Sequence, residues 1–233
     1  MKLLLISNST NAGEEYLRYP LQEIARTLAG VREIAFVPYA AVTFSYAEYE
    51  RKVQARLAEI GIRVRSVHRA ADPARMIRRA EAVCVGGGNT FALAKKMQEQ
   101  GLMQAIRNRI RAGVPYVGWS AGSNVCCPTI STTNDMPIVE PSSFRAIGAV
   151  KFQINPHYLD ANPAGHAGET REQRILEFIE ANPRRWVVGL REGCMLRCEE
   201  GRLELIGSRP MRIFKKGQTP FEANPGDDLS FLL

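Results

Sequence analysis

The chain has 233 residues, of which 45% are hydrophobic and 24% are charged, and its formal net charge is +7. This length allows a sizeable hydrophobic core, and the composition is that of an ordinary globular protein. No apolar run approaches the roughly 20 residues of a membrane span, and the polar residues after the opening MKLLLIS argue against a signal peptide. We therefore expect a single domain over residues 1–233 that works in the cytoplasm and does not contact a membrane.

The five cysteines and three histidines show no spacing typical of a metal site or of a disulfide framework. We therefore expect neither a metal nor a cofactor. Basic residues are mixed with acidic ones along the expected helices, a pattern typical of solvated helix faces and not of a nucleic-acid interface. The positive balance would instead help to attract small acidic substrates. Both a monomer and a homodimer are compatible with the sequence.

Short apolar runs alternate with segments of helical periodicity through most of the chain. The expected strands are 2–7, 32–40, 62–68, 81–85 (running into a glycine turn at 86–89), 114–119, 151–156 and 185–191, and the expected helices are 21–30, 46–60, 72–81, 91–112 and a segment that begins after Thr170. This alternation predicts an α/β fold whose mostly parallel sheet is flanked by helices on both faces. Residues 194–207 predict a C-terminal antiparallel hairpin, and the runs 211–217 and 230–233 predict further antiparallel edge strands.

The run Gly118-Trp119-Ser120-Ala121-Gly122 fits the G-x-S-x-G pattern of a nucleophile elbow. A serine on such a tight strand-to-helix turn has a strained backbone, and small neighbours two residues away let the chain pass closely. The turn would lift the Ser120 hydroxyl above the sheet and aim the Ala121 amide at a developing oxyanion. The alternative is a serine that only caps a helix after a strand.

Four polar clusters follow predicted strands, at Gly86–Asn89, Ser120, His157 and Glu192. Ligands of parallel sheets gather beyond the carboxyl ends of the strands, so these clusters should meet at one edge. A serine hydroxyl needs a base to take its proton, and His157 is the candidate base. His68 also ends a predicted strand, but arginines flank it, and we expect it at the surface.

The imidazole needs an acid that fixes its tautomer, and two acids qualify. Glu192 follows a strand and would project over the same edge, whereas Asp135 lies in the loop TTNDMPIVEP, where it could instead form a turn. We expect the Gly88 amide to join that of Ala121 in an oxyanion hole.

Three residues are candidates for substrate binding. Arg171 would lie at the positive end of the helix that begins after Thr170, where amides and guanidinium could hold a carboxylate, although a plain surface arginine fits the same spacing. Asn89, at the end of the glycine turn, and His166, in the loop PAGHAG, are the other two.

With GGGNT, GWSAGSN, TTNDMPIV, INPH, GETREQR and a late Glu-Gly in this order, the chain closely resembles the peptidase E family of α-aspartyl dipeptidases. The resemblance implies a cytoplasmic serine peptidase for dipeptides with N-terminal aspartate, on a fold similar to class I glutamine amidotransferases. It implies catalytic roles for Ser120 and His157, with the third member at Asp135 or Glu192. It also implies that Arg171 recognises the aspartate side chain of the substrate.

Three other functions fit the same motifs. A cyanophycinase-like hydrolase would cleave β-aspartyl dipeptides, a small-molecule esterase would need no acidic group, and a binding module would have no reactive serine. The chain also departs from the family pattern at Arg191, which precedes Glu192, and at the Cys126–Cys127 pair. The first departure could alter how Glu192 is presented.

Overall fold

The computed structural model describes residues 1–162, 164–165 and 167–233. Within these residues the main sheet has seven strands. In spatial order they are β3 (Arg63–Ser66), β2 (Glu33–Val37), β4 (Val83–Val85), β5 (Tyr116–Trp119), β1 (Lys2–Ile6), β8 (Met195–Glu199) and β9 (Arg202–Ile206). Strands β1 to β5 run parallel, and the hairpin β8–β9 adds antiparallel to the free side of β1. The expected C-terminal hairpin is therefore present.

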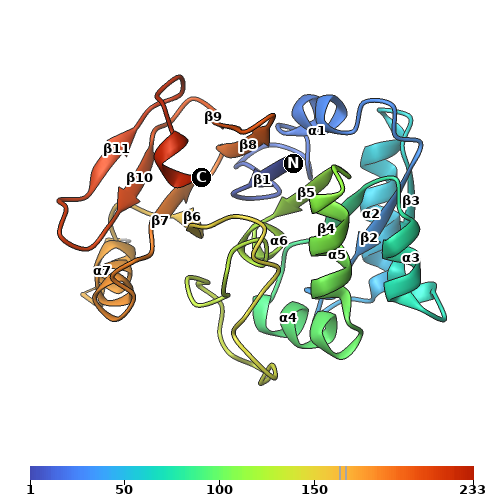
Figure 1. The fold of residues 1–233 in the computed structure, drawn as a ribbon, viewed down its shortest axis with the longest axis horizontal. Helices are drawn as coiled ribbons and strands as arrows, with labels where there is room; N and C mark the ends of the chain where they lie inside the picture. Colours follow the sequence, from blue (N-terminus) through green and yellow to red (C-terminus); the bar gives the residue numbers. More distant parts are fainter. Residues whose placement is uncertain (163, 166) are drawn as a thin grey trace.

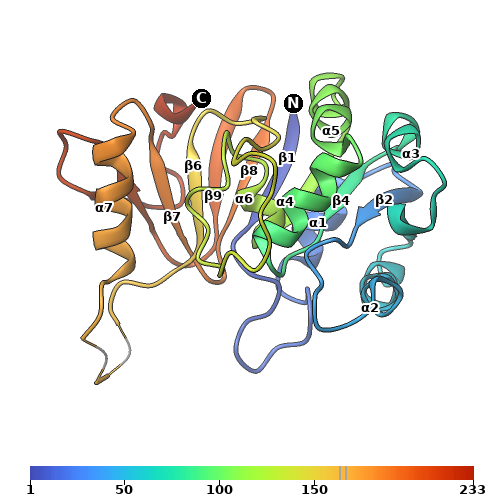
Figure 2. The ribbon, with the colours of Figure 1, turned by 90° about the horizontal axis from the view of Figure 1, so that it is seen from below.

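Helices cover both faces of the main sheet (Figure 1, Figure 2). The helices are α1 (Leu21–Thr27), α2 (Tyr46–Ala58), α3 (Pro73–Arg79), α4 (Thr90–Glu99), α5 (Leu102–Arg111) and α6 (Ala121–Asn124), with a 3₁₀ turn η1 (Val67–Arg69) after β3. Successive side chains of a strand point to opposite faces. Leu3 and Leu5 of β1 accordingly pack with α3, α4 and α5, whereas Leu4 and Ile6 pack with α1 and α2.

The helix boundaries follow the capping residues of the sequence. Asp72 accepts a hydrogen bond from the amide of Arg75 at the start of α3, as an N-cap aspartate should. The single helical region that we expected over 91–112 is wrong, because Gly101 adopts a left-handed conformation (φ +66°) and separates α4 from α5. Glycine ends helices in this way because it has no Cβ to clash.

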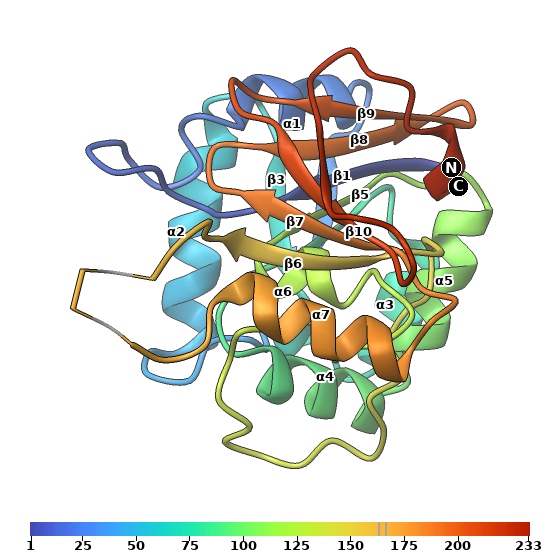
Figure 3. The same cartoon turned by 90° about the vertical axis from the view of Figure 1, so that its left-hand side faces the viewer.

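A second sheet lies beside the first, and its existence corrects the expectation of one sheet. Its spatial order is β11 (Phe221–Ala223), β10 (Met211–Phe214), β7 (Val187–Arg191) and β6 (Gln153–Tyr158). The strands predicted at 151–156 and 185–191 pair parallel with each other and not with the main sheet. Strand β10 was predicted at an edge but lies between β7 and β11. The two sheets are seen side by side in Figure 3.

The second sheet is held in place by burial on both of its faces. Ile154 and Leu190 join the core that contains Leu3 and Leu5, so one hydrophobic core runs between the two sheets. Helix α7 (Arg171–Ala181) covers the outer face, where Ile175 and Ile179 pack on β7 and β10 (Figure 2).

The strand expected at 230–233 is also wrong. Residues Ser230–Leu232 form a 3₁₀ turn, η2, whose buried Leu232 packs into the core. Short apolar runs fit either a strand or a buried turn, and periodicity alone does not separate the two. None of the helices in the described part of the chain has the length and apolar character that crossing a bilayer requires.

Candidate active site

Ser120 occupies a strained turn between β5 and α6. Its φ of +53° lies in a region that non-glycine residues rarely adopt, which is the backbone geometry of a nucleophile elbow. The two glycines of the motif are required by packing. A Cβ at Gly122 would lie 2.0 Å from the carbonyl oxygen of Val85, and one at Gly118 would lie 2.5 Å from the carbonyl oxygen of Gly122.

The glycine turn after β4 packs directly against this elbow. A Cβ on Gly87 would lie 2.9 Å from the Cβ of Ser120, so the two turns are in contact. Tyr49 of α2 fixes their relative position, because its hydroxyl donates to the Gly87 carbonyl and accepts from the indole nitrogen of Trp119. No local pattern indicated this role of Tyr49, because it depends on a contact across 38 residues of chain.

His157 lies within hydrogen-bonding distance of the serine. Its Nε2 is 2.9 Å from the Ser120 hydroxyl oxygen, and its Nδ1 is 2.6 Å from Oε1 of Glu192. A carboxylate can only accept hydrogen bonds, so the imidazole proton belongs on Nδ1 and the unprotonated Nε2 is free to accept from Ser120. This is the arrangement that a serine needs for activation by a general base.

A β-bulge places the imidazole. Pro156 pairs with Leu190 and Tyr158 pairs with Arg191, so His157 is an extra residue in the parallel pairing of β6 with β7. Its φ of +53° turns it out of the regular pleat. Bulges commonly re-aim a side chain beside a site in this manner.

The two candidate acids occupy different places. Glu192 follows β7 and contacts His157, whereas the carboxylate of Asp135 accepts from the amide of Thr90 and from the Thr133 hydroxyl. Asp135 therefore holds its loop against the first turn of α4. Of the two acids, the structure brings Glu192 into contact with the imidazole.

The amides expected in an oxyanion hole lie on the two packed turns. Ala121 is the first residue of α6, and Gly88 (φ +131°) sits against Ala40, whose carbonyl oxygen would be 2.3 Å from a Cβ at Gly88. Within the described residues neither amide donates a hydrogen bond to a protein acceptor. Two free amides beside a nucleophile suit an oxyanion.

Arg171 is the first residue of α7, whose N-cap Thr170 and Gln173 form the expected capping box. The side chain is half-buried, and across the part of the chain that the structure describes it forms no ion pair. Burial lowers the pKa of Arg171, Arg174 lowers it further, and Asp135 acts in the opposite direction. A partly desolvated cation at a helix N-terminus is a good binding point for a carboxylate.

The remaining substrate-binding candidates are less well placed or undescribed. Asn89 caps α4 by accepting from the amide of Ala92, and its side-chain nitrogen donates to the carbonyl of Met136, so both ends of its amide have protein partners. His166 lies outside the described residues. His68 belongs to η1 after the edge strand β3, where it bonds with Ser66.

An ion cluster beside Glu192 was missed by sequence reasoning. Arg191 is buried, and its guanidinium binds the carboxylates of Asp160 and Glu222. These pairs raise the pKa of Arg191 and lower the pKa of both acids. The cluster joins the end of β7 to β11 and to the residues that follow β6. The sequence feature that could have indicated this cluster is an arginine at the end of an otherwise apolar strand, because a buried charge needs partners of opposite charge.

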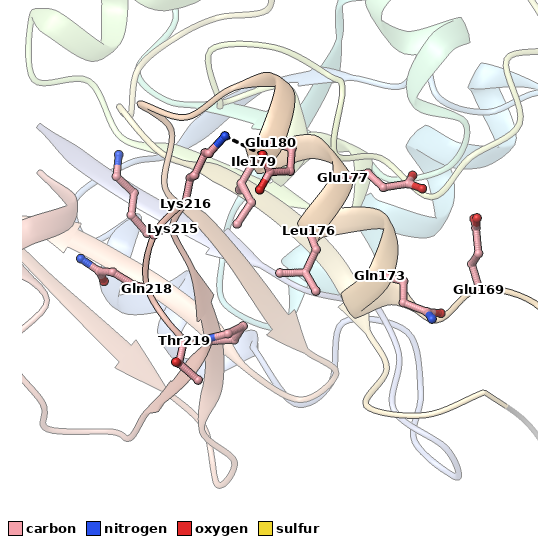
Figure 4. A pocket seen from close by; sticks show the side chains of 12 residues that line it. Glu169, Gln173, Leu176, Glu177, Ile179, Glu180, Lys215, Lys216, Gln218 and Thr219 are labelled. Atoms are coloured by element: carbon pink, nitrogen blue, oxygen red, sulfur yellow. Dashed lines mark hydrogen bonds and ion pairs between the residues drawn. The ribbon is translucent and has the colours of Figure 1, made fainter.

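A groove of about 770 Å³ lies elsewhere, between α7 and the segment after β10 (Figure 4). Leu176 and Thr219 face it from the two sides, and an ion pair between Lys216 and Glu180 crosses one end. None of the candidate catalytic residues lines this groove. Among the residues that the structure describes, no three His, Cys, Asp or Glu side chains are grouped as metal ligands.

The chain is similar to curated proteins named Peptidase E. The chain is 51% identical to Peptidase E of a Nostoc species, over all of this chain and 96% of that protein. It is 48% identical to Peptidase E of Streptomyces coelicolor, over all of this chain and 95% of that protein.

A solved structure has a similar fold. The crystal structure of a peptidase from an acI-B1 Actinobacterium superposes with a TM-score of 0.72 at 18% identity, covering 99% of this chain and 96% of that one. The sequence model of peptidase family S51 matches residues 3–206, a span that includes the elbow, the imidazole and Glu192. The chain belongs to peptidase family S51.

Proposed function

We propose that the protein is a serine-type dipeptidase that hydrolyses dipeptides with an N-terminal aspartate. The observation that carries the proposal is the continuous hydrogen-bonded series Ser120–His157–Glu192. Membership of a peptidase family and the similarity to proteins named Peptidase E support it. We also propose that the fold belongs to the class I glutamine amidotransferase-like group, on the grounds of the elbow between β5 and α6 and the helices on both sheet faces.

The mechanism is acyl transfer to water. Ser120 Oγ attacks the peptide carbonyl while His157 Nε2 takes the hydroxyl proton, and Glu192 stabilises the imidazolium that forms. The amides of Gly88 and Ala121 hold the oxyanion. His157 then returns the proton to the leaving amine, and a water activated by the same imidazole releases the acyl group from Ser120.

Specificity for aspartate comes from Arg171 in this proposal. Its side chain is half-buried and forms no ion pair within the described chain, and the α7 N-terminus adds a positive potential at the same place. An Asn-X dipeptide has no charge to pair with this arginine. The loss of a charge-assisted hydrogen bond is worth about 1.5–3 kcal/mol, or about 10- to 150-fold in kcat/KM.

A panel of Asp-X, Asn-X, Glu-X and β-Asp-X dipeptides tests the proposal. Wild-type protein should prefer Asp-X, Ser120→Ala should lose turnover, and Arg171→Ala should lose its preference for Asp-X over Asn-X. Arg174→Ala is the matched control, because Arg174 lies on the same helix but pairs with Glu169. Full activity of Ser120→Ala would refute the mechanism, and an unchanged Asp/Asn ratio in Arg171→Ala would refute the specificity.

The same panel separates the rival functions. A cyanophycinase-like hydrolase would cleave β-Asp-X in preference to Asp-X. An esterase would turn over simple esters without an acidic group and would cleave none of the dipeptides. A binding module would fail to react at Ser120 with a serine-directed phosphonate.

A further inference from the structure

Ser7 lies at the point where the two sheets meet. It follows β1 directly and is completely buried. Its hydroxyl donates to the carbonyl of Leu190 on β7 at 2.7 Å and accepts from the backbone amide of His157 at 3.0 Å. One hydroxyl of the main sheet thus binds both strands of the second sheet that carry candidate catalytic residues.

The bond to His157 gives a partner to an amide that the bulge leaves out of the strand pairing. Because His157 is the extra residue between two paired positions, its amide has no partner in the β6–β7 ladder. A buried amide without a partner is costly, and the Ser7 hydroxyl supplies the acceptor. The backbone conformation that aims the imidazole is therefore stabilised by a side chain from the other sheet.

The same segment also bonds with Ser120 and with residues on either side of Glu192. The carbonyl of Ile6 accepts from the amide of Ser120 at 3.0 Å. The Ser7 amide donates to the carbonyl of Cys194, and the Ser7 hydroxyl donates to the carbonyl of Leu190, so Glu192 is bracketed from both sides. Ile6 and Ser7 are adjacent in the chain, so their bonds tie the backbone at Ser120, at His157 and on both sides of Glu192 to one point at the end of β1.

We propose that Ser7 is a positioning residue of the active site, which holds the bulged His157 and the end of β7 in register with Ser120. This inference rests on the proposed function, because it assumes that the three residues work together. Ser7 has no contact with substrate in this scheme. It acts by fixing the distance between the imidazole and the serine, and displacements of about 1 Å in such a geometry cost about 10²-fold in rate.

The test is steady-state kinetics of Ser7→Ala on an Asp-X dipeptide. We expect kcat to fall by about 10- to 100-fold while KM changes by less than about threefold, because the substrate-binding groups are untouched. The downfield proton resonance of the imidazole N–H that is bonded to Glu192 should weaken or shift. The rate at which a phosphonate labels Ser120 should fall in parallel with kcat.

Ser66→Ala is the matched control. Ser66 is also completely buried and is the last residue of a parallel strand, but that strand is the edge strand β3, and its hydroxyl bonds with His68. It should lose stability without a change in kcat or in the proton resonance. Ser7→Cys serves as the second variant, since a thiol is slightly larger than the hydroxyl and leaves no cavity but is a weak hydrogen-bonding partner, and it should also lose kcat at constant KM.

Folded Ser7→Ala or Ser7→Cys protein with kcat within about threefold of wild type would overturn the inference. An equal loss of kcat in Ser66→Ala would also overturn it, because the effect would then be general destabilisation. Wild-type protein that neither cleaves dipeptides nor reacts with the phosphonate would refute the proposed function and, with it, this inference. If the phosphonate labels Ser120 of the wild type but Asp-X is not cleaved, only the substrate assignment is wrong. The rates at which the phosphonate labels the Ser7 variants then still test whether Ser7 positions His157.

Discussion

Replacing Glu192 by Gln tests which acid supports the imidazole. The substitution keeps the size of the side chain and removes its charge, so the imidazolium of the proposed mechanism would lose its counter-ion 2.6 Å away. Unit charges about 4 Å apart attract by about 1 kcal/mol in water and by about 4 kcal/mol at a protein surface. Each 1.4 kcal/mol changes a rate tenfold, so this attraction corresponds to about five- to 10³-fold in kcat.

Loss of the correct imidazole tautomer adds to this effect. In a fully buried triad the amide replacement costs about 10⁴-fold. Here the side chain of Glu192 is 47% exposed, so water can replace part of its interaction. We therefore expect Glu192→Gln to lower kcat by about 10²- to 10³-fold with little change in KM.

Asp135→Asn is the matched control for this prediction. Its carboxylate binds the Thr90 amide and the Thr133 hydroxyl, and an amide oxygen can still accept one of these bonds. We expect less than about tenfold loss of kcat and a free energy of unfolding lowered by about 1 kcal/mol. Initial rates of amino-acid release from an Asp-X dipeptide measure both variants. Near-normal kcat in Glu192→Gln with a loss above about 10²-fold in Asp135→Asn would refute the assignment.

Three further predictions follow from packing and ion pairs. Gly122→Ala should lower the free energy of unfolding by about 3 kcal/mol or more, because the new methyl would overlap the Val85 carbonyl, and a urea midpoint equal to that of wild type would contradict this packing. Tyr49→Phe should lower kcat about three- to tenfold at constant KM, since the Gly87 carbonyl and the Trp119 indole lose their shared partner, and unchanged kinetics would exclude this role. Arg191→Met should cost about 2–3 kcal/mol of stability, less than the loss of a fully buried pair because its acidic partners stay partly in water. The pKa values of Asp160 and Glu222 are lowered in the folded state, so this stabilisation is fully present above their ordinary values of 3.8 and 4.5 and is lost as the pH falls through the lowered values. A difference in the free energy of unfolding between wild type and Arg191→Met that persists at pH 2 would contradict the assignment.

Local rules accounted for most of the main sheet. The alternation of apolar runs and helical periodicity predicted β1, β2, β4 and β5, and the capping residues Asp72 and Thr170 marked helix starts that the structure contains. The prediction of one long helix over 91–112 was wrong at Gly101. The helical periodicity of apolar residues continues through this position, but the left-handed backbone of Gly101 ends one helix before the next begins. The strand predicted at 230–233 was wrong because 3₁₀ turns and strands bury similar apolar residues.

The sequence by itself identified the residues of the candidate site. The G-x-S-x-G spacing fixes the sharp turn at Ser120, since only glycines fit against Val85 and the following turn, and strand ends identified the polar groups that gather there. Tertiary structure alone decided how those groups meet. His157 and Glu192 come from a second sheet whose strands pair with one another and not with the main sheet. A bulge turns His157 toward Ser120, and the buried hydroxyl of Ser7 binds the backbone amide of His157. Strand partners and bulges depend on contacts between residues far apart in the chain, and the periodicity of one segment carries no information about its partner.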